Sequence, residues 1–258
     1  MRQRPLLTYF VLCFVLTWTL AGLGIVAPEL AERIFGPPGV TNPSFYLAVY
    51  VPSVVGILLT AFYDGTAGLK ALLRRLDPRR GGVWVLVTIG LFIAMGAAGG
   101  WIGSLFGAPA PQWSLRQAPM ILATGLLLDP GGLGEEFGWR GFALPRLLDR
   151  FNPLVASLVL GFIWGIWHLP AFYLPTLPQS QFNFPIFVVS TIGLAIIMTW
   201  LALKSGQNLL VAITAHLMMN HVSAITGVAL GPMQATIVAV ALLLVLTGRR
   251  PDDDEPTD

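Results

Sequence analysis

The sequence contains few charged residues for its length. Only 11% of its 258 residues are Asp, Glu, Lys or Arg, whereas soluble domains carry roughly 25%. Hydrophobic residues make up 55% of the chain, and the mean hydropathy is +0.73. This shortage of charge excludes an ordinary water-soluble domain and indicates a protein that lies in a lipid bilayer. The net charge of +2 is too small to indicate nucleic-acid binding.

Cysteine and histidine are also scarce. Cys13 is the single cysteine and lies within the first apolar run. One cysteine cannot form a disulfide within the chain, and it cannot build a cysteine-based metal site. The chain has three histidines, so their positions in the sequence carry weight.

Long apolar runs are abundant. A helix needs about 20 apolar residues to cross a bilayer, whereas the strands of a membrane β-barrel alternate in polarity. The runs here are continuous and predict an all-α, polytopic membrane protein with about eight transmembrane helices. The expected spans are 6–27, 45–63, 83–106, 118–148, 154–173, 185–203, 208–226 and 231–247.

The fourth expected span is the least regular of the eight. It is interrupted by Asp129-Pro-Gly-Gly132 and ends in an amphipathic stretch at 142–149. Proline and paired glycines break or kink helices. We therefore expect a discontinuous helix at this point.

The first apolar run resembles a signal sequence, because it follows a short basic segment. It is long for the apolar part of a signal, however, and no small-x-small cleavage site precedes Pro28. We interpret it as a retained helix. The expected organisation is one membrane domain over 1–250 and an acidic, disordered cytoplasmic tail over 251–258.

Lys and Arg are distributed unevenly between the two sides of this topology. With the N-terminus inside, thirteen of the fifteen fall in or near cytoplasmic segments: Arg2, Arg4, Lys70, Arg74, Arg75, Arg79, Arg80, Arg140, Arg146, Arg150, Lys204, Arg249 and Arg250. Only Arg33 and Arg116 fall outside. The positive-inside rule then predicts a cytoplasmic (plasma) membrane protein with both termini cytoplasmic, and with access to its site from that face.

The segment 69–80 allows two interpretations. Leu69, Leu72, Leu73 and Leu76 are spaced for one helical face, with basic residues between them. This pattern is typical of an interfacial helix on an anionic leaflet. A simple basic loop fits equally well.

Ionisable residues inside transmembrane spans are costly and are therefore functional candidates. The fourth span contains Glu135, Glu136 and Arg140, and the fifth contains His168. The seventh contains His216, Asn220 and His221. These positions hold all three histidines of the chain.

Helical geometry relates several of these residues. Glu136 and Arg140 are four apart and can pair on one face, while Glu135 is turned from Glu136 by about 100°. If the fourth and fifth spans form a hairpin near 151–153, Glu135 and His168 both lie roughly 20 Å from its end. The two side chains are therefore expected to meet inside the membrane.

The residue types suit a hydrolytic site. A carboxylate and an imidazole together can activate water for attack on a carbonyl. A second histidine and an asparagine, here His216 and Asn220, can donate hydrogen bonds to the developing oxyanion. The sequence has no Ser-His-Asp order and no His-Glu-x-x-His motif.

Three motifs resemble those of the CPBP family of intramembrane proteases, also called the CAAX-protease or Abi family, which includes the Rce1-like enzymes. Glu-Glu-x-x-x-Arg corresponds to Glu135–Arg140, and His-x-x-x-Asn corresponds to His216–Asn220. Phe-x-x-x-His corresponds to Trp164–His168, with Trp164 in place of Phe at what we interpret as a packing position. The resemblance covers about 118–226.

The resemblance implies an eight-helix fold with an active-site cavity in the membrane and hydrolysis of a peptide bond by glutamate-activated water. It implies that Glu135 is the general base, that His168 orients the water, and that His216 and Asn220 form the oxyanion hole. Glu136 and Arg140 become supporting residues. It implies no metal and no other cofactor. The partners expected are membrane lipids and a membrane-anchored or lipidated peptide or protein substrate.

Other interpretations stay open at this point. Glu136–Arg140 could be a purely structural ion pair, and His221 fits a contact between helices. Asp129 could cap or break a helix and line a water entrance. The histidines and glutamates could also bind zinc. A small transporter or proton relay, or a non-catalytic membrane scaffold, could use the same polar residues, although no inverted repeat is visible.

Overall fold

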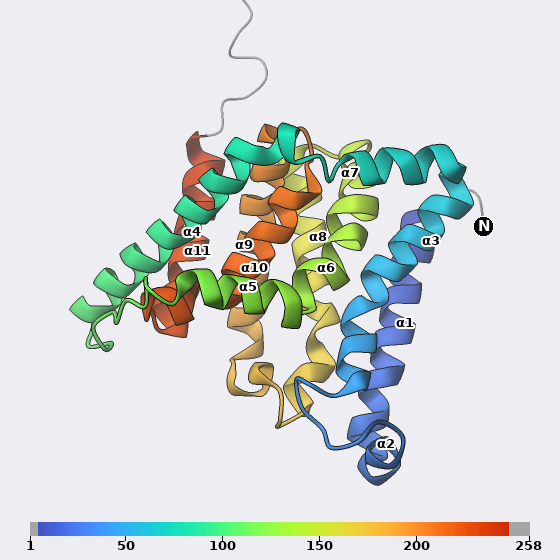
Figure 1. The fold of residues 1–258 in the computed structure, drawn as a ribbon, viewed down its shortest axis with the longest axis horizontal. Coiled ribbons are helices and arrows are strands. Elements are labelled where there is room, and N and C mark those ends of the chain that lie inside the picture. The colour runs from blue at the N-terminus through green and yellow to red at the C-terminus, as the bar shows by residue number, and fades with distance from the viewer. Residues whose placement is uncertain (1–4, 248–258) are drawn as a thin grey trace, which may run out of the picture.

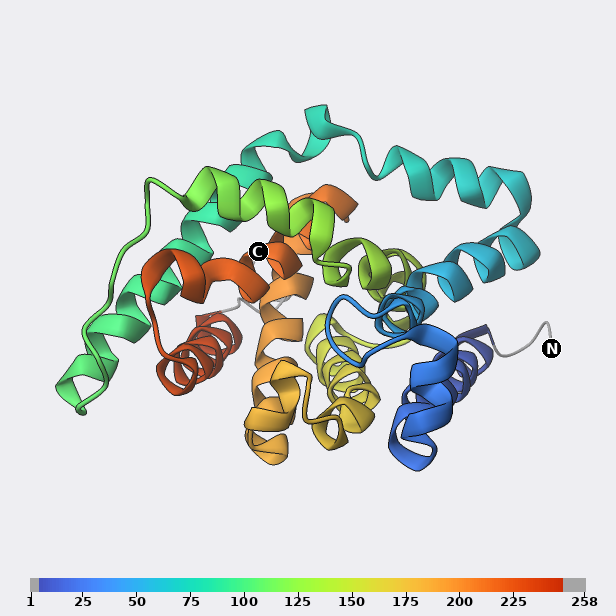
Figure 2. The ribbon, with the colours of Figure 1, turned by 60° about the horizontal axis from the view of Figure 1, so that its bottom comes forward.

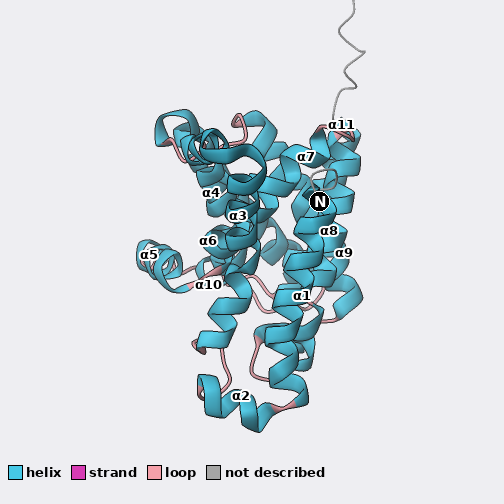
Figure 3. Cartoon of the chain, turned by 90° about the vertical axis from the view of Figure 1, so that its right-hand side faces the viewer, coloured by secondary structure: helices cyan, strands magenta, loops and turns pink. Residues whose placement is uncertain are grey.

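The computed structural model describes residues 5–247, which form helices and loops without a β-strand (Figure 3). The helices are α1 (Pro5–Val26), α2 (Pro28–Phe35), α3 (Pro43–Arg74), α4 (Pro78–Leu105), α5 (Ala118–Leu128), α6 (Gly131–Glu136), the π-helix η1 (Phe137–Ala143), α7 (Leu144–Leu148), α8 (Pro153–Trp167), the 3-10 helices η2 (Leu169–Tyr173) and η3 (Pro178–Gln181), α9 (Phe184–Lys204), α10 (Leu209–Thr226) and α11 (Leu230–Thr247). The all-α fold is confirmed. The predicted acidic tail, 251–258, lies outside the described residues.

Seven helical segments of the described chain are long and apolar enough to cross a membrane: α1, α3, α4, α8 with η2, α9, α10 and α11. They coincide with seven of the eight expected spans and confirm a polytopic membrane protein. The remaining expected span, 118–148, consists of α5, α6, η1 and α7 in succession. The helix is interrupted at Asp129 and Pro130, where the sequence predicted a discontinuity.

Several helix starts are specified by an Asn or Asp followed by a helix-initiating residue. Asn152 accepts a hydrogen bond from the Val155 amide, and Pro153 occupies the first position of α8. Asn183 starts α9 and Asp77 starts α4 in the same way. Such side chains satisfy amides at a helix start that have no partner within the helix, and proline at the first position loses no hydrogen bond.

One end of the bundle is formed by the α3–α4, α7–α8 and α9–α10 turns, and we call it the basic end. Arg75, in the α3–α4 turn, donates to the carbonyl oxygen of Gln207 in the α9–α10 turn at 2.7 Å and to those of Arg140 and Gly141 in η1 at 2.8 and 3.0 Å. Burial lowers the pKa of Arg75 to about 10, so the guanidinium keeps its charge at neutral pH. Figure 1 shows the first residues of α1 and the last of α11 at this end.

The opposite end of the bundle is formed by α2, η2 and η3, and we call it the far end (Figure 1). Asn42 organises the loop there by donating from Nδ2 to the carbonyl oxygens of Phe35, Gly36 and Pro37 at 2.8–3.1 Å. Its Oδ1 accepts from the Ser44 amide at the start of α3. One buried side chain thus holds both the loop and the helix that follows it.

Helix α3 is interrupted at Gly65, whose φ of 65° is rare for other residues. The residues after Gly65 run across the basic end (Figure 1). Leu72 is buried there, while Leu73 and Arg74 are exposed. Of the two interpretations of 69–80, the helix therefore holds as far as Arg74, and a short break precedes α4.

Helix α6 lies between α3 and α10 (Figure 2). Glycines allow this close approach: a Cβ added at Gly134 would lie 2.9 Å from the Val49 carbonyl oxygen of α3, and one added at Gly132 would lie 3.2 Å from Ile213 of α10. The neighbouring glycines that weakened the helical pattern in the sequence are thus the residues that admit α6 to the centre of the bundle.

Candidate active site

Glu135 and Glu136 are both buried, with 3% and 0% of their surface exposed, yet they have different partners. Glu135 Oε2 accepts hydrogen bonds from Trp139 Nε1 at 3.1 Å and Trp164 Nε1 at 2.6 Å. Glu136 Oε1 accepts from Arg140 Nη1 at 3.1 Å. The two carboxylates therefore diverge, as their helical spacing predicted, and the Glu136–Arg140 pair forms.

His216 on α10 lies against both carboxylates. Its Nδ1 is 2.7 Å from Glu136 Oε1, and its Nε2 is 3.9 Å from Glu135 Oε1. Because an ionised carboxylate only accepts, Nδ1 carries the proton of that hydrogen bond. We call Glu135, Glu136, Arg140 and His216 the interior cluster.

His168 forms the end of α8 and is fixed by backbone and aromatic contacts. Its Nδ1 lies 2.8 Å from the Trp164 carbonyl oxygen. A carbonyl only accepts, so Nδ1 is the donor, and Nε2 of the neutral ring carries a lone pair. The ring packs against Trp167 and Phe187, with centroids 4.8 and 5.1 Å away. His168 therefore presents a proton acceptor in a defined orientation.

Trp164 connects the predicted residues to one another. Its indole donates to Glu135, and its carbonyl accepts from His168. Its ring lies 5.5 Å from that of His216, and the guanidinium carbon of Arg140 lies 4.3 Å from its centroid, within cation–π distance. The interpretation of Trp164 as a packing position was incomplete, because its N–H also holds Glu135. Glu135 and His168 approach the same residue, in agreement with the predicted hairpin.

A second group of polar residues lies beside the first. Asp129 Oδ2 accepts from Asn220 Nδ2 at 2.8 Å and lies 3.1 Å from His221 Nε2. Asp129 Oδ1 accepts from the Gly131 amide at 2.9 Å, at the start of α6. We call Asp129, Asn220 and His221 the mouth cluster. His221 contacts another segment of the chain, as expected, but it does so through a carboxylate that Asn220 shares.

Gly131 separates the two clusters. A Cβ at this position would lie 2.6 Å from His216 Nε2 and 3.0 Å from Asn220 Nδ2. Real Cβ atoms do not approach other atoms as closely as 2.6 Å. The absence of a side chain at Gly131 therefore allows His216 and Asn220 to face the same space.

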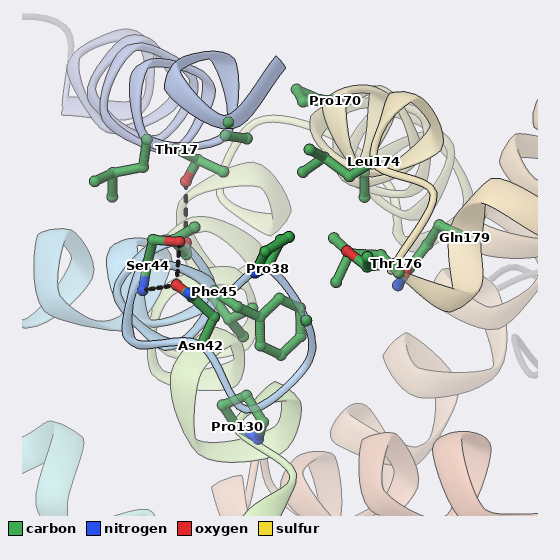
Figure 4. A pocket seen from close by; sticks show the side chains of 18 of the residues that line it. Thr17, Pro38, Asn42, Ser44, Phe45, Pro130, Pro170, Leu174, Thr176 and Gln179 are labelled. Atoms are coloured by element: carbon green, nitrogen blue, oxygen red, sulfur yellow. Dashed lines mark hydrogen bonds between the residues drawn. The ribbon is translucent and has the colours of Figure 1, made fainter. Parts of the chain in front are cut away.

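Two adjoining cavities, of about 230 and 820 Å³, meet at the site. Glu135, His168, His216 and Asn220 all line the smaller one, and the last three also line the larger one. Figure 4 shows the smaller cavity, with Thr17 and Phe45 on one side and Leu174 and Thr176 on the other. Glu136 and Arg140 line neither cavity and are fully buried next to residues that do.

The structure offers no ligand set for zinc in the part of the chain that it describes. Within 5–247, no group of three or more His, Cys, Asp or Glu side chains is arranged to hold a metal ion. His216 uses Nδ1 for Glu136, and His168 uses Nδ1 for a backbone carbonyl. The arrangement instead supplies a buried carboxylate beside two imidazoles, together with an amide donor at the cavity.

Comparison with known proteins agrees with the motifs. Residues 115–222 match the family model for type II CAAX prenyl endopeptidases that are Rce1-like. This segment is therefore similar to an Rce1-like domain. A CAAX prenyl protease 2 from Methanococcus maripaludis is 35% identical over 92 residues, which cover 33% of this chain and 34% of that protein. The chain thus aligns with about one third of the length of this curated relative.

The matched segment contains all six residues that the motifs single out, from Glu135 to Asn220. Sequence reasoning did not identify Trp139 as a partner of Glu135, although the two are four residues apart, a spacing at which helical side chains meet. Asp129 was considered as a cap or an entrance residue. It does receive the Gly131 amide and line both cavities, but its contact with Asn220 was not foreseen.

Proposed function

We propose that this protein is an intramembrane endopeptidase in which Glu135 activates the attacking water. The observation that carries the proposal is the position of the Glu135 carboxylate. Two indole N–H groups hold Oε2, while Oε1 lies toward His216 and the residue lines the cavity. A carboxylate fixed through one oxygen keeps the other available to accept a proton from water.

The reaction balances with the residues at hand. A water held between Glu135 and the His168 Nε2 lone pair gives a proton to Glu135 and attacks the peptide carbonyl carbon. The new C–O bond forms a tetrahedral intermediate with a negatively charged oxygen. When the C–N bond breaks, the proton held by Glu135 passes to the leaving amine. The products are a carboxylic acid and an amine.

Asn220 and His216 would stabilise the oxyanion, because Asn220 Nδ2 and His216 Nε2 face the space around Gly131. Donation from His216 Nε2 requires both ring nitrogens to carry protons. The Glu136 carboxylate at 2.7 Å would balance the resulting positive charge. Glu136 and Arg140 would therefore act by orienting His216 and not by contacting the peptide.

The proposed substrate is a membrane-anchored or lipidated peptide. The site lies among apolar spans, so the molecules that can reach it are the lipids and the protein chains held in the bilayer. The M. maripaludis relative is named as a prenyl protease.

The test is Glu135→Gln in the full chain, reconstituted in lipid vesicles with a panel of lipid-anchored reporter peptides. Removal of the general base should lower kcat by about 10²- to 10⁴-fold and leave thermal unfolding nearly unchanged. The matched control is Glu29→Gln on α2, an exposed carboxyl that does not line the site. Wild-type activity should persist with a chelator. Full activity of Glu135→Gln would refute the glutamate base, and loss of activity with chelator would favour a metal enzyme.

A further inference from the structure

The site cavity extends toward the far end of the bundle. Beyond Glu135, its lining comes from the second half of α1 at Thr17 and Gly24, from Glu32 on α2, and from Leu174 and Thr176 between η2 and η3. Neither of the two cavities is lined by a residue of the three turns that form the basic end. The opening is therefore at the end opposite to those turns.

The basic end is closed over the site by packed side chains. Phe142 and Leu144, which follow the interior cluster in the chain toward the α7–α8 turn, are fully buried. Arg75 links the α3–α4 turn to the α9–α10 turn and to η1 through its bonds to three backbone carbonyls. A peptide approaching from the basic end would have to displace this core before it could reach Glu135.

Charge distinguishes the two ends. Among the described residues, the basic end carries eight Lys and Arg: Lys70, Arg74, Arg75, Arg79, Arg80, Arg146, Arg150 and Lys204. The far end carries one, Arg33, the α4–α5 loop carries another, Arg116, and Arg140 is buried in the bundle. Short segments rich in Lys and Arg stay in the cytoplasm. The positive-inside rule thus places the far end, with the cavity opening, on the other side of the membrane.

We infer that this protein takes its substrate from the non-cytoplasmic side of the membrane, as a peptide anchored in or near the outer leaflet. The inference rests on the proposed function only in taking the cavity as the peptide site. It reverses the sequence-based expectation that access lies on the same face as the termini. A lipidated peptide confined to the cytoplasmic leaflet would meet the closed end of the bundle.

Hydrogen bonds hold the rim of the cavity opening in place. Asn42 is 6% exposed and lines the cavity while binding three carbonyls of the 35–37 segment. Across the opening, Ser180 Oγ donates to the Leu177 carbonyl oxygen at 2.8 Å and so ties η3 to the loop before it. Both sides of the opening are thereby held by local hydrogen bonds, which keeps a route to Glu135 in place.

The experiment is labelling of single cysteines in cells that express the full chain in a bacterial cytoplasmic membrane. Thr176→Cys places a thiol at the exposed cavity rim, and Asp149→Cys places one at the exposed α7–α8 turn. The parent chain is the control, because its single Cys13 is buried. A membrane-impermeant maleimide should label Thr176→Cys in intact cells, whereas labelling of Asp149→Cys should be lost unless the cells are permeabilised.

The reverse labelling pattern, or labelling of both variants in intact cells, would overturn the inference. Sealed vesicles of known orientation provide a second arm, with a reporter peptide anchored in one leaflet at a time. Cleavage confined to the peptide on the far-end side supports the inference, and cleavage confined to the basic-end side overturns it. If the labelling agrees but neither peptide is cleaved, even in detergent, the orientation stands and the proposed function fails.

Discussion

The interior cluster and the mouth cluster lie on either side of Gly131, but they differ in their contact with water. Glu135, Glu136 and Arg140 are at most 3% exposed, whereas the side chains of Asp129 and His221 are 17% and 25% exposed. Asn220 is exposed to the cavity as well. The same helix, α10, supplies His216 to one cluster and Asn220 to the other, one turn apart.

This difference indicates a division of labour. Charges removed from water are tolerated only when they pair, so the interior cluster must stay intact for the fold and for the orientation of Glu135 and His216. The mouth cluster is partly solvated, and its loss costs less in folding. Substitutions should therefore separate the two: breaking the Glu136–Arg140 pair should lower stability, and mouth changes should lower the rate without unfolding the protein.

The largest expected effect is that of Arg140→Met. It leaves Glu136 buried without its cationic partner, and breaking a buried pair in this way costs about 3–5 kcal/mol. Thermal unfolding in detergent should report a large loss of stability. The control is Arg80→Met, whose partner Asp77 is 3.7 Å away at an exposed position, where a pair contributes less than about 1 kcal/mol. Equal losses in the two variants would contradict a distinct interior cluster.

Asn220→Ala should act on the rate. Removal of one oxyanion donor typically lowers kcat by about 10²- to 10³-fold. Stability should change little, because the side chain faces the cavity. Ser223→Ala, at another position on α10 that lines the larger cavity, is the matched control and should retain activity. A variant that unfolds instead of slowing would place Asn220 with the interior cluster.

Gly131→Ala tests the boundary between the clusters. The added Cβ would overlap His216 Nε2, and overpacking of this kind costs about 1–3 kcal/mol. Both stability and kcat should therefore fall. Gly90→Ala on α4 is the control, because its added Cβ meets nothing within 4 Å and alanine favours a helix. If Gly131→Ala behaved like Gly90→Ala, the two clusters would not share a tight boundary.

The smallest expected effect is that of Asp129→Asn, which removes the charge that holds Asn220. Weakening a hydrogen bond to a charged group by about 1.4 kcal/mol corresponds to about a tenfold fall in kcat, with KM nearly unchanged. The double variant Asp129→Asn/Asn220→Ala should be no slower than Asn220→Ala alone, because the two residues act through one contact. Additive losses would show that Asp129 has an independent role.

Much of the fold could be predicted from the sequence because the signals are local. Seven expected spans match helices whose ends lie near Asn, Asp, Pro or Gly, and the expected break in the fourth span occurs at Asp129 and Pro130. Helix α3 contains the expected span 45–63 and continues past Gly65 to Arg74 as a less apolar helix. A hydropathy pattern marks where a helix leaves the apolar region and not where it ends.

The polar partners were harder to predict. Glu136–Arg140 follows from a spacing of four, but Trp164–Glu135, His216–Glu136 and Asn220–Asp129 join residues 29, 80 and 91 positions apart. The motif order indicated which residues belong together without giving their contacts. Those contacts depend on the glycines that bring α6 against α3 and α10.

The sequence by itself determined that this protein lies in a lipid bilayer, where its helices are, and that charge is distributed unequally between its two ends. Each of these properties depends on composition and short-range spacing. Only the tertiary structure decided that Trp139 and Trp164 hold Glu135, that Asp129 holds Asn220, and that the cavity opens away from the basic end. The direction of the opening follows from which faces of distant helices pack together and which stay apart, a property that no single segment of the chain encodes.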